Sequence, residues 1–205
     1  MYKQLFSGIF FLFFIESAVA IEEPKYTVLE KSEPFELRAY SSKVIAEVLV
    51  AGNLSDASSE GFKLIADYIF GNNSSGTGNN EKISMTAPVT MASMSKESSM
   101  AVPVIIEKTT TQWRMYFVMP SKYTLDTLPK PNNAQVKLRN IPAGNYAVIQ
   151  FSGLAGEAKV AHKTADLMWW LNSKNIRPLG VAQLARYNPP WTLPFLRRNE
   201  ILVVY

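Results

Sequence analysis

Two segments of this chain carry the same sequence pattern at a constant offset of 101 positions. Residues 35–70 and 136–171 both begin with alternating apolar and polar residues, which is typical of strands with one dry face. Both then continue with apolar residues at helical spacing, and Gly52 in the first segment falls on Gly153 in the second. A strand, strand, helix order that occurs twice predicts a duplicated fold.

The duplication predicts internal repeats at about 26–120 and 121–205, whose strands join into one antiparallel sheet or closed barrel with two helices outside. Alternation predicts strands at 35–40, 43–52, 102–108, 113–120, 134–141, 145–153 and 200–205. Helical spacing predicts helices at 55–70 and 156–175, with Ser55 as the cap of the first. A Gly, Asn and Ser run at 71–80 is expected to be a loop, and 93–99 a hairpin connection.

The stretch KISMTAPVTM, residues 82–91, alternates apolar and polar side chains but contains a proline. Alternation predicts a strand with one dry face, whereas Pro88 has no N–H to donate to a neighbouring strand. The segment is therefore expected to be an edge, a bulge or a strand end. Its methionines, Met85 and Met91, are expected to lie in the core.

The N-terminus has the three parts of an export signal. Lys3 supplies a positive charge, an apolar run extends from Leu5 to Ile15, and Ala18-Val19-Ala20 matches a cleavage site. We expect residues 1–20 to be removed and residues 21–205 to form one domain in the periplasm or secreted outside the cell. An uncleaved anchor is the alternative.

The composition narrows the function classes. Cysteine is absent, which removes thiolate ligands and cysteine nucleophiles. The net charge is +4, but apart from Arg197-Arg198 the basic residues are isolated and interleaved with acids, as on a solvated surface. This distribution argues against a nucleic-acid partner.

The chain has no arrangement typical of catalysis. Its one histidine, His162, stands four residues before Asp166 and beside Lys163, which suits a surface ion pair on a helix. No G-x-S-x-G, H-E-x-x-H or EF-hand motif is present. No catalytic residue and no metal site is predicted.

Several stretches together resemble the SOUL heme-binding protein family, in the order in which that family carries them. They are FELRAY (35–40), GFKLIADYIFG (61–71), KISMTAPVTM (82–91), FSG (151–153) and YNPPW…RRNEI (187–201). The resemblance implies an α+β fold, a distorted eight-stranded antiparallel β-barrel built from two pseudo-symmetric repeats, each with an outer α-helix. It further implies non-catalytic binding of heme or a related tetrapyrrole, as a carrier or buffer, by a protein expected to be a monomer.

The resemblance also implies where the ring lies. It places the macrocycle against the first helix and the loop that precedes the last strand. In this sequence the implied contact residues are Ser59, Phe62, Ile65 and Ala66 on the helix, and Trp191 and Thr192 within the segment 189–194. A flat apolar ring needs such aliphatic and aromatic contacts, with donors at the rim for its carboxylates. The same side chains also suit ordinary packing.

The sequence departs from the family pattern at three positions. Some members carry a histidine where this chain has Ala39, and others carry basic residues near Ser59 and Thr192. The expected cofactor is therefore heme without a histidine axial ligand. Arg197 and Arg198 are candidates to replace the missing basic residues, but the sequence does not place them relative to the ring. Two alternatives remain open: an interaction or structural module of the same fold that has lost the ligand, and an unrecognised hydrolase or tetrapyrrole-modifying enzyme.

Overall fold

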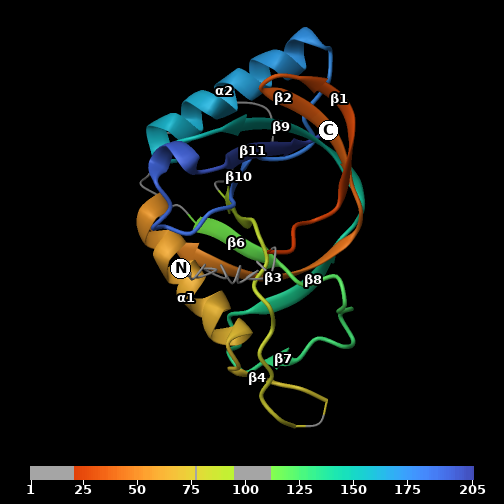
Figure 1. The fold of residues 1–205 in the computed structure, drawn as a ribbon, viewed down its shortest axis with the longest axis vertical. Helices are drawn as coiled ribbons and strands as arrows, with labels where there is room; N and C mark the ends of the chain where they lie inside the picture. The colour runs from red at the N-terminus through yellow and green to blue at the C-terminus, as the bar shows by residue number, and fades with distance from the viewer. Residues whose placement is uncertain (1–20, 77, 95–111) are drawn as a thin grey trace, which may run out of the picture.

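A nine-stranded antiparallel sheet curls through the computed structural model, which describes residues 21–76, 78–94 and 112–205 (Figure 1). The expected export signal, the strand at 102–108 and most of the connection at 93–99 lie outside the described residues. In chain order the elements are β1 (Tyr26–Ser32), β2 (Phe35–Tyr40), β3 (Lys43–Ala51), α1 (Leu54–Ile69), β4 (Asn73–Ser74), β5 (Val89–Ser93), β6 (Gln112–Val118), β7 (Lys130–Pro131), β8 (Lys137–Ile141), β9 (Gly144–Phe151), α2 (Glu157–Ser173), β10 (Gln183–Arg186), the 3₁₀ helix η1 (Pro194–Leu196) and β11 (Asn199–Val204).

The sheet has the order β1-β2-β9-β11-β10-β5-β6-β3-β8, and β4 and β7 form a separate ribbon. The predicted α+β class, with an antiparallel sheet and two helices, is confirmed. The closed eight-stranded barrel is not, because the described sheet has nine strands and ends at β1 and β8 without a pairing between them. Of the described residues, no helix is both long and apolar enough to cross a membrane.

With β1 set aside, the strand order is β2-β9-β11-β10 from one edge of the sheet and β8-β3-β6-β5 from the other. β2 pairs with β9, and β8 pairs with β3. Two residues that lie opposite each other in one pair have counterparts, 101 positions away in the sequence, that lie opposite each other in the other pair. Leu37 lies opposite Ala147 in the first pair, and Leu138 lies opposite Ala46 in the second. These four residues are counterparts at the offset of 101 positions. At the centre of the sheet β5 pairs with β10.

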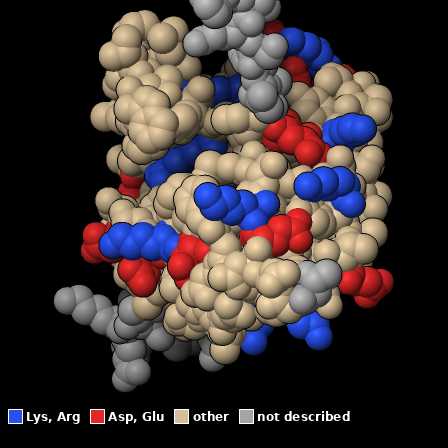
Figure 2. Space-filling view, turned by 60° about the horizontal axis from the view of Figure 1, so that its bottom comes forward, with Lys and Arg blue, Asp and Glu red and all other residues tan. Residues whose placement is uncertain are grey.

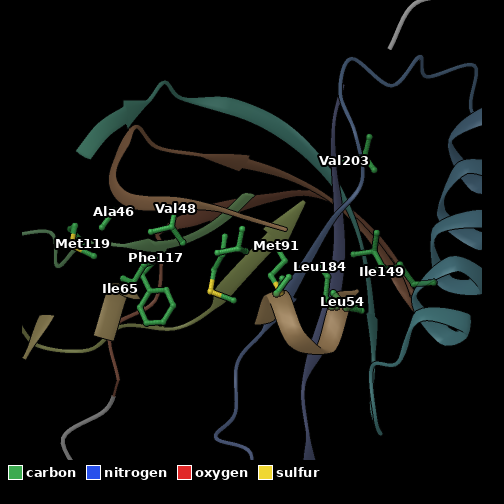
Figure 3. Packing of buried hydrophobic residues seen from close by; sticks show 14 of the residues in the cluster. Ala46, Val48, Leu54, Ile65, Met91, Phe117, Met119, Ile149, Leu184 and Val203 are labelled. Carbon is green, nitrogen blue, oxygen red and sulfur yellow. The ribbon is translucent and has the colours of Figure 1, made fainter. Parts of the chain in front are cut away.

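One row of directly opposed residues crosses seven strands and carries both helices on the same face of the sheet. The row runs Phe35, Ile149, Ile201, Leu184, Met91, Met115, Val48. At one end the α2 residue Trp170 stacks on Phe35 with ring centroids 4.9 Å apart. Towards the other end Gly61 of α1 lies so close to Met115 that an added Cβ would be 2.8 Å from its sulfur. The row and the helices share one apolar core (Figure 3).

Helix α1 begins one residue earlier than expected, and a different side chain caps it. The Asn53 side-chain oxygen accepts the backbone N–H groups of Ser55 and Asp56, at 3.0 and 2.9 Å. Asparagine in an extended conformation before the first helical residue is a favoured N-cap. The prediction that Ser55 caps the helix was therefore wrong by two positions.

The KISMTAPVTM stretch forms a strand only in its last part. β5 begins at Val89, directly after the proline, because Pro88 has no N–H for a ladder. The expectation of a strand end at Pro88 is therefore confirmed, and the alternation before it does not form a strand. Met91 is 2 % exposed in the core, and Met85 packs against that core partly buried.

The other face of the sheet carries buried charged and aromatic side chains. Arg38 and Glu200 form a bidentate pair, with Nη1 to Oε2 at 3.0 Å and Nη2 to Oε1 at 3.2 Å. The Tyr187 hydroxyl donates to the same carboxylate at 2.6 Å. Burial raises the pKa of Tyr187 and, to about 12, that of Tyr40. These groups therefore keep their ordinary charge states near neutral pH.

Candidate functional site

The first turns of the two helices meet beside β10. The backbone N–H of Leu54, at the start of α1, donates to the Glu157 carboxylate in the first turn of α2, at 3.0 Å. Figure 1 shows η1, in dark blue, between these two helix starts. We call this place, formed by the two helix starts, the end of β10 and residues 188–198, the helix junction.

A cation in the helix junction has no carboxylate partner in the described part of the chain. Arg186, the last residue of β10, donates to the Ser58 hydroxyl at 2.7 Å and to the Ala155 carbonyl at 3.1 Å. No ion pair formed among the described residues includes Arg186. Burial, and secondly the charge of Arg197, lower the pKa of the Arg186 guanidinium from its usual value. An anionic group at this place would compensate both for the burial of the Arg186 charge and for its repulsion by Arg197.

A second arginine shapes the loop that follows. Arg197 donates through Nε to the Thr192 carbonyl at 2.7 Å and through Nη2 to the Pro190 carbonyl. The loop is held to the start of α2 because Gly153 donates its N–H to the Pro194 carbonyl at 2.9 Å. The segment 188–198 is therefore fixed by hydrogen bonds rather than by burial of its side chains.

The apolar side chains of this loop point away from the core. Five large residues gather around η1 and the neighbouring turn before α2, and we call them the apolar rim. They are Leu154, Trp191, Leu193, Phe195 and Leu196, with exposed fractions of 61, 82, 56, 70 and 62 %. Exposed apolar patches of this kind mark ligand, protein or membrane contacts in soluble proteins.

The residues predicted for the ligand site divide into two groups. Ser59 is exposed and donates its hydroxyl to the Ser55 carbonyl at 3.1 Å, and Phe62 is 39 % exposed with its ring 5.6 Å from that of Phe117. Ile65 and Ala66 face the sheet, with exposed fractions of 0 and 7 %. These two support the helix from beneath and offer no free surface to a ring.

Trp191 and Thr192 lie in the helix junction, in the loop that reaches the start of α2. Hydrogen bonds from Arg186 connect that place to Ser58, the neighbour of Ser59 on α1. The start of α1 and the loop before the last strand therefore meet at one place.

Sequence reasoning missed Arg186, although it carried a signal. Leu184 and Arg186 stand two positions apart in a strand, so they share the face that packs under the helices. A cation at a position where alternation predicts a buried apolar residue is unusual, and it marks a polar site. The four-residue length of β10 hid this pattern.

Heme iron finds no histidine at the helix junction. His162 is 71 % exposed in its side chain on α2, with Nδ1 3.4 Å from Asp166, so the predicted surface ion pair is confirmed. Ala39 lies on β2, which β9 and β11 separate from β10. Within residues 21–76, 78–94 and 112–205 no group of three or more His, Asp or Glu side chains could hold a metal ion.

The surface charges are interleaved on the face drawn in Figure 2, where Lys and Arg side chains lie beside Asp and Glu. One lysine differs. Lys43 lines a hollow of about 520 Å³ and lies over two rings, 4.6 Å from the centroid of Tyr40 and 5.3 Å from that of Tyr146. Burial lowers the pKa of the Lys43 amine to about 8.

Three solved structures share the fold at low sequence identity. An uncharacterized conserved protein from Listeria innocua is 10 % identical, with a TM-score of 0.61 over 83 % of this chain and 92 % of that one. The C-terminal domain of EcmrR is 13 % identical, with a TM-score of 0.59 over 87 and 96 %. A hydrolase from Listeria innocua is 11 % identical, with a TM-score of 0.54 over 86 and 94 %. Likeness at these identities establishes the fold alone.

No curated protein sequence matches the chain. A family model does, and it covers residues 21–204, which is nearly all of the described part. The model is that of the SOUL heme-binding protein, a family described by what it binds. The chain belongs to the SOUL heme-binding protein family.

Proposed function

We propose that this protein binds heme or a related flat, anionic tetrapyrrole at the helix junction without chemically changing it. The ring would lie between the exposed ring of Phe62, beside Ser59, and the apolar rim that includes Trp191. Thr192 lies in the loop that Arg197 holds in place. Ile65 and Ala66 would support α1 from the core side.

The observation that carries the proposal is Arg186. Its guanidinium is partly buried, and its two hydrogen bonds go to neutral oxygens. Among the described residues, it forms no ion pair with a carboxylate. A propionate would supply the missing negative charge through charge-assisted hydrogen bonds. Apolar contact with the ring, together with this pair, supports a dissociation constant on the order of micromolar, or about −8 kcal/mol.

The test is a Soret titration of the purified protein with hemin, using two exposed tryptophans as a matched pair. Trp191→Ala removes part of the apolar rim and is expected to weaken binding about tenfold. Trp169→Ala removes a tryptophan that is 71 % exposed on α2, away from η1, and is expected to leave the titration unchanged. Equal effects of the two substitutions would place the ring elsewhere.

Two variants that each remove one arginine charge complete the experiment. Arg186→Gln keeps hydrogen-bond donors near Ser58 and removes the charge, so we expect about a tenfold loss of hemin affinity. Arg177→Gln removes an exposed arginine beyond the end of α2 and serves as its control. An unchanged affinity in Arg186→Gln, with circular dichroism and melting temperature preserved, would contradict the proposal.

A second candidate is an interaction module of the same fold that has lost the ligand. The exposed apolar rim favours it, since five large apolar side chains in one place also suit a protein contact. The hemin titration separates the two functions: a folded protein that gives no Soret shift at millimolar concentration supports the module. Turnover of bound hemin, followed by mass spectrometry, would instead indicate an enzyme.

We also propose that the eight strands other than β1 and the β4–β7 ribbon descend from two copies of one unit. The strand orders from the two edges, β2-β9-β11-β10 and β8-β3-β6-β5, and the registers of Leu37 with Ala147 and of Ala46 with Leu138 support this. In both copies a glycine with positive φ follows the second strand, Gly52 at 121° after β3 and Gly153 at 96° after β9. Superposition of residues 35–70 on 136–171 tests the proposal, and helices on unrelated strands after superposition would contradict it.

The setting that we propose is an exported compartment, where the protein would act as a monomeric carrier or buffer. Lys3, the apolar run and Ala18-Val19-Ala20 support export with cleavage after Ala20. Mass spectrometry of the protein from its host should find Ile21 as the first residue. An intact Met1 on membrane-bound protein would contradict it.

A further inference from the structure

A groove runs along α2 on the helix-bearing face of the sheet, at a place that the proposed tetrapyrrole site does not use. Its volume is about 870 Å³, within the range of small-molecule sites. Its floor is the centre of the strand row, made by Met91, Leu184 and Ile201. Each of these three side chains is less than a tenth exposed, so they support the groove from beneath, and its accessible surface comes from the partly exposed side chains of its walls.

Two walls enclose this floor. Val160, Thr164 and Met168 form one wall, at successive turns of α2. The other wall is the segment 177–182, which connects α2 to β10. That wall is held in place because Leu179 donates its N–H to the Val204 carbonyl at 2.7 Å. The groove is therefore preformed by the backbone on both sides.

The lining favours an alkyl chain over a flat ring. Its apolar residues are aliphatic or methionine except for Trp113, and methionine side chains adapt to irregular shapes. A macrocycle gains most from aromatic faces, of which this groove offers one. Residues 160–168 of α2 span about 12 Å at 1.5 Å per residue, which is the length of the wall that this helix contributes.

The charge at the groove is of one sign. Among the described residues its lining contains Arg177 and no Asp or Glu. Arg177 is exposed at the rim and takes part in no ion pair among the described residues. An apolar groove with one unpaired cation at its rim is complementary to a molecule with a long apolar part and one carboxylate.

We propose that the α2 groove is a second ligand site and that it binds a long-chain alkyl carboxylate of the fatty-acid type. The chain lies between Val160, Thr164 and Met168 of α2 and the segment 177–182, and the carboxylate accepts hydrogen bonds from the Arg177 guanidinium. This site is independent of the helix junction, where Arg186 and the apolar rim lie.

The experiment is a fluorescence titration of the purified full chain with cis-parinaric acid, a naturally fluorescent long-chain carboxylate. Thr164→Trp places a large ring in the groove and is expected to reduce affinity at least tenfold. Ala165→Trp adds the same ring at the adjacent, exposed position of α2 and is expected to leave affinity unchanged. Equal affinities of the two variants would overturn the proposal.

The carboxylate is tested separately from the chain. Arg177→Gln should weaken binding of the acid about tenfold and leave binding of its methyl ester unchanged, because the ester has no charge to pair. Arg186→Gln is the control and should change neither. Loss of ester binding in Arg177→Gln, or the same affinity for the acid as the wild type, would contradict the assignment of Arg177.

Competition separates this site from the tetrapyrrole site. Saturating hemin is expected to leave the parinarate dissociation constant unchanged after correction for absorbance, and Trp191→Ala should weaken hemin alone. If hemin displaces parinarate stoichiometrically, the groove is the tetrapyrrole site and the second site does not exist. If hemin does not bind while parinarate does, the proposed function fails and the groove assignment stands.

Discussion

The Glu157 carboxylate accepts the backbone N–H of Leu54 at 3.0 Å, so the first turn of α2 supplies a cap to the first turn of α1. The first N–H groups of a helix have no partner within the helix. Asn53 satisfies those of Ser55 and Asp56, and Glu157 satisfies that of Leu54. This hydrogen bond joins the two helices that form the helix junction.

Glu157→Ala is therefore expected to lower the free energy of unfolding by about 0.5–2 kcal/mol, since a buried donor loses its acceptor. Glu157→Gln keeps an oxygen in place and should cost less than the alanine variant. Chemical denaturation measures both. Glu60→Ala, at an exposed position of α1, is the control, and a loss as large as that of Glu157→Ala would show that the effect is not specific to the cap.

The buried pair Arg38–Glu200 predicts a strong coupling. Arg38 is 2 % exposed and Glu200 0 %. Glu200→Leu leaves a buried guanidinium without its bidentate partner, so we expect a loss of about 3–5 kcal/mol in the free energy of unfolding. The double variant Arg38→Met/Glu200→Leu should lose clearly less than the two single losses added, because neither charge is then left alone.

Denaturant midpoints of the wild type, both single variants and the double variant complete the cycle. Arg139→Met is the control, because Arg139 pairs with Glu47 at 2.9 Å with 41 % of its side chain exposed. Because this pair is partly exposed, its loss is expected to cost less than the loss of the buried pair. Strictly additive losses at Arg38 and Glu200 would show that the pair is not coupled.

Lys43 predicts a pH dependence of stability. Burial lowers its pKa in the folded protein to about 8, from 10.5 in the unfolded chain. Between these values the unfolded chain binds more protons, so this lysine makes stability rise as the pH increases from about 8 to 10. Below pH 8 the amine is charged in both states, and folding carries the whole cost of burying it.

The Lys43→Met variant tests this sign. Its stability advantage over the wild type should be largest at pH 7 and shrink towards pH 10, as measured by urea denaturation. Tyr40, which faces the amine, has its pKa raised to about 12 and therefore stays neutral across this window. Lys25→Met, at an exposed position lining the same hollow, controls for the lost charge. An advantage that grows with pH would contradict the assignment.

Alternation was sufficient to predict the strands that have one side in the core. β2 was predicted with its observed ends, and β3, β6 and β9 within two residues, because each contributes to the row under the helices. β1 was missed because all seven of its residues are exposed, so burial imposed no pattern on its sequence. The closed barrel could not be tested by periodicity, since pairing between distant edges leaves no local signal.

The ligand site could be predicted only in part, for a related reason. The family motifs indicated α1 and the loop before β11, and hydrogen bonds at Ser58 and Pro194 bring these places together. The charge at the site comes from Arg186, on a strand too short to show alternation. The sequence also did not show that Ile65 and Ala66 face the sheet and not the ligand, because helical spacing marks an apolar stripe without indicating what covers it.

The exposed helix position Ser59 predicts a gain of function. It lies one residue after Ser58, which accepts the Arg186 hydrogen bond, and its own hydroxyl only returns to the Ser55 carbonyl. Ser59→Arg would place a second guanidinium at the junction, where a tetrapyrrole carries two carboxylates. We expect the hemin affinity to rise by about 1–2 kcal/mol, or roughly tenfold, in a Soret titration. His162→Ala, on the exposed side of α2, should leave that titration unchanged. If His162→Ala removes the absorbance change, or if Ser59→Arg weakens it, the ring does not lie against α1.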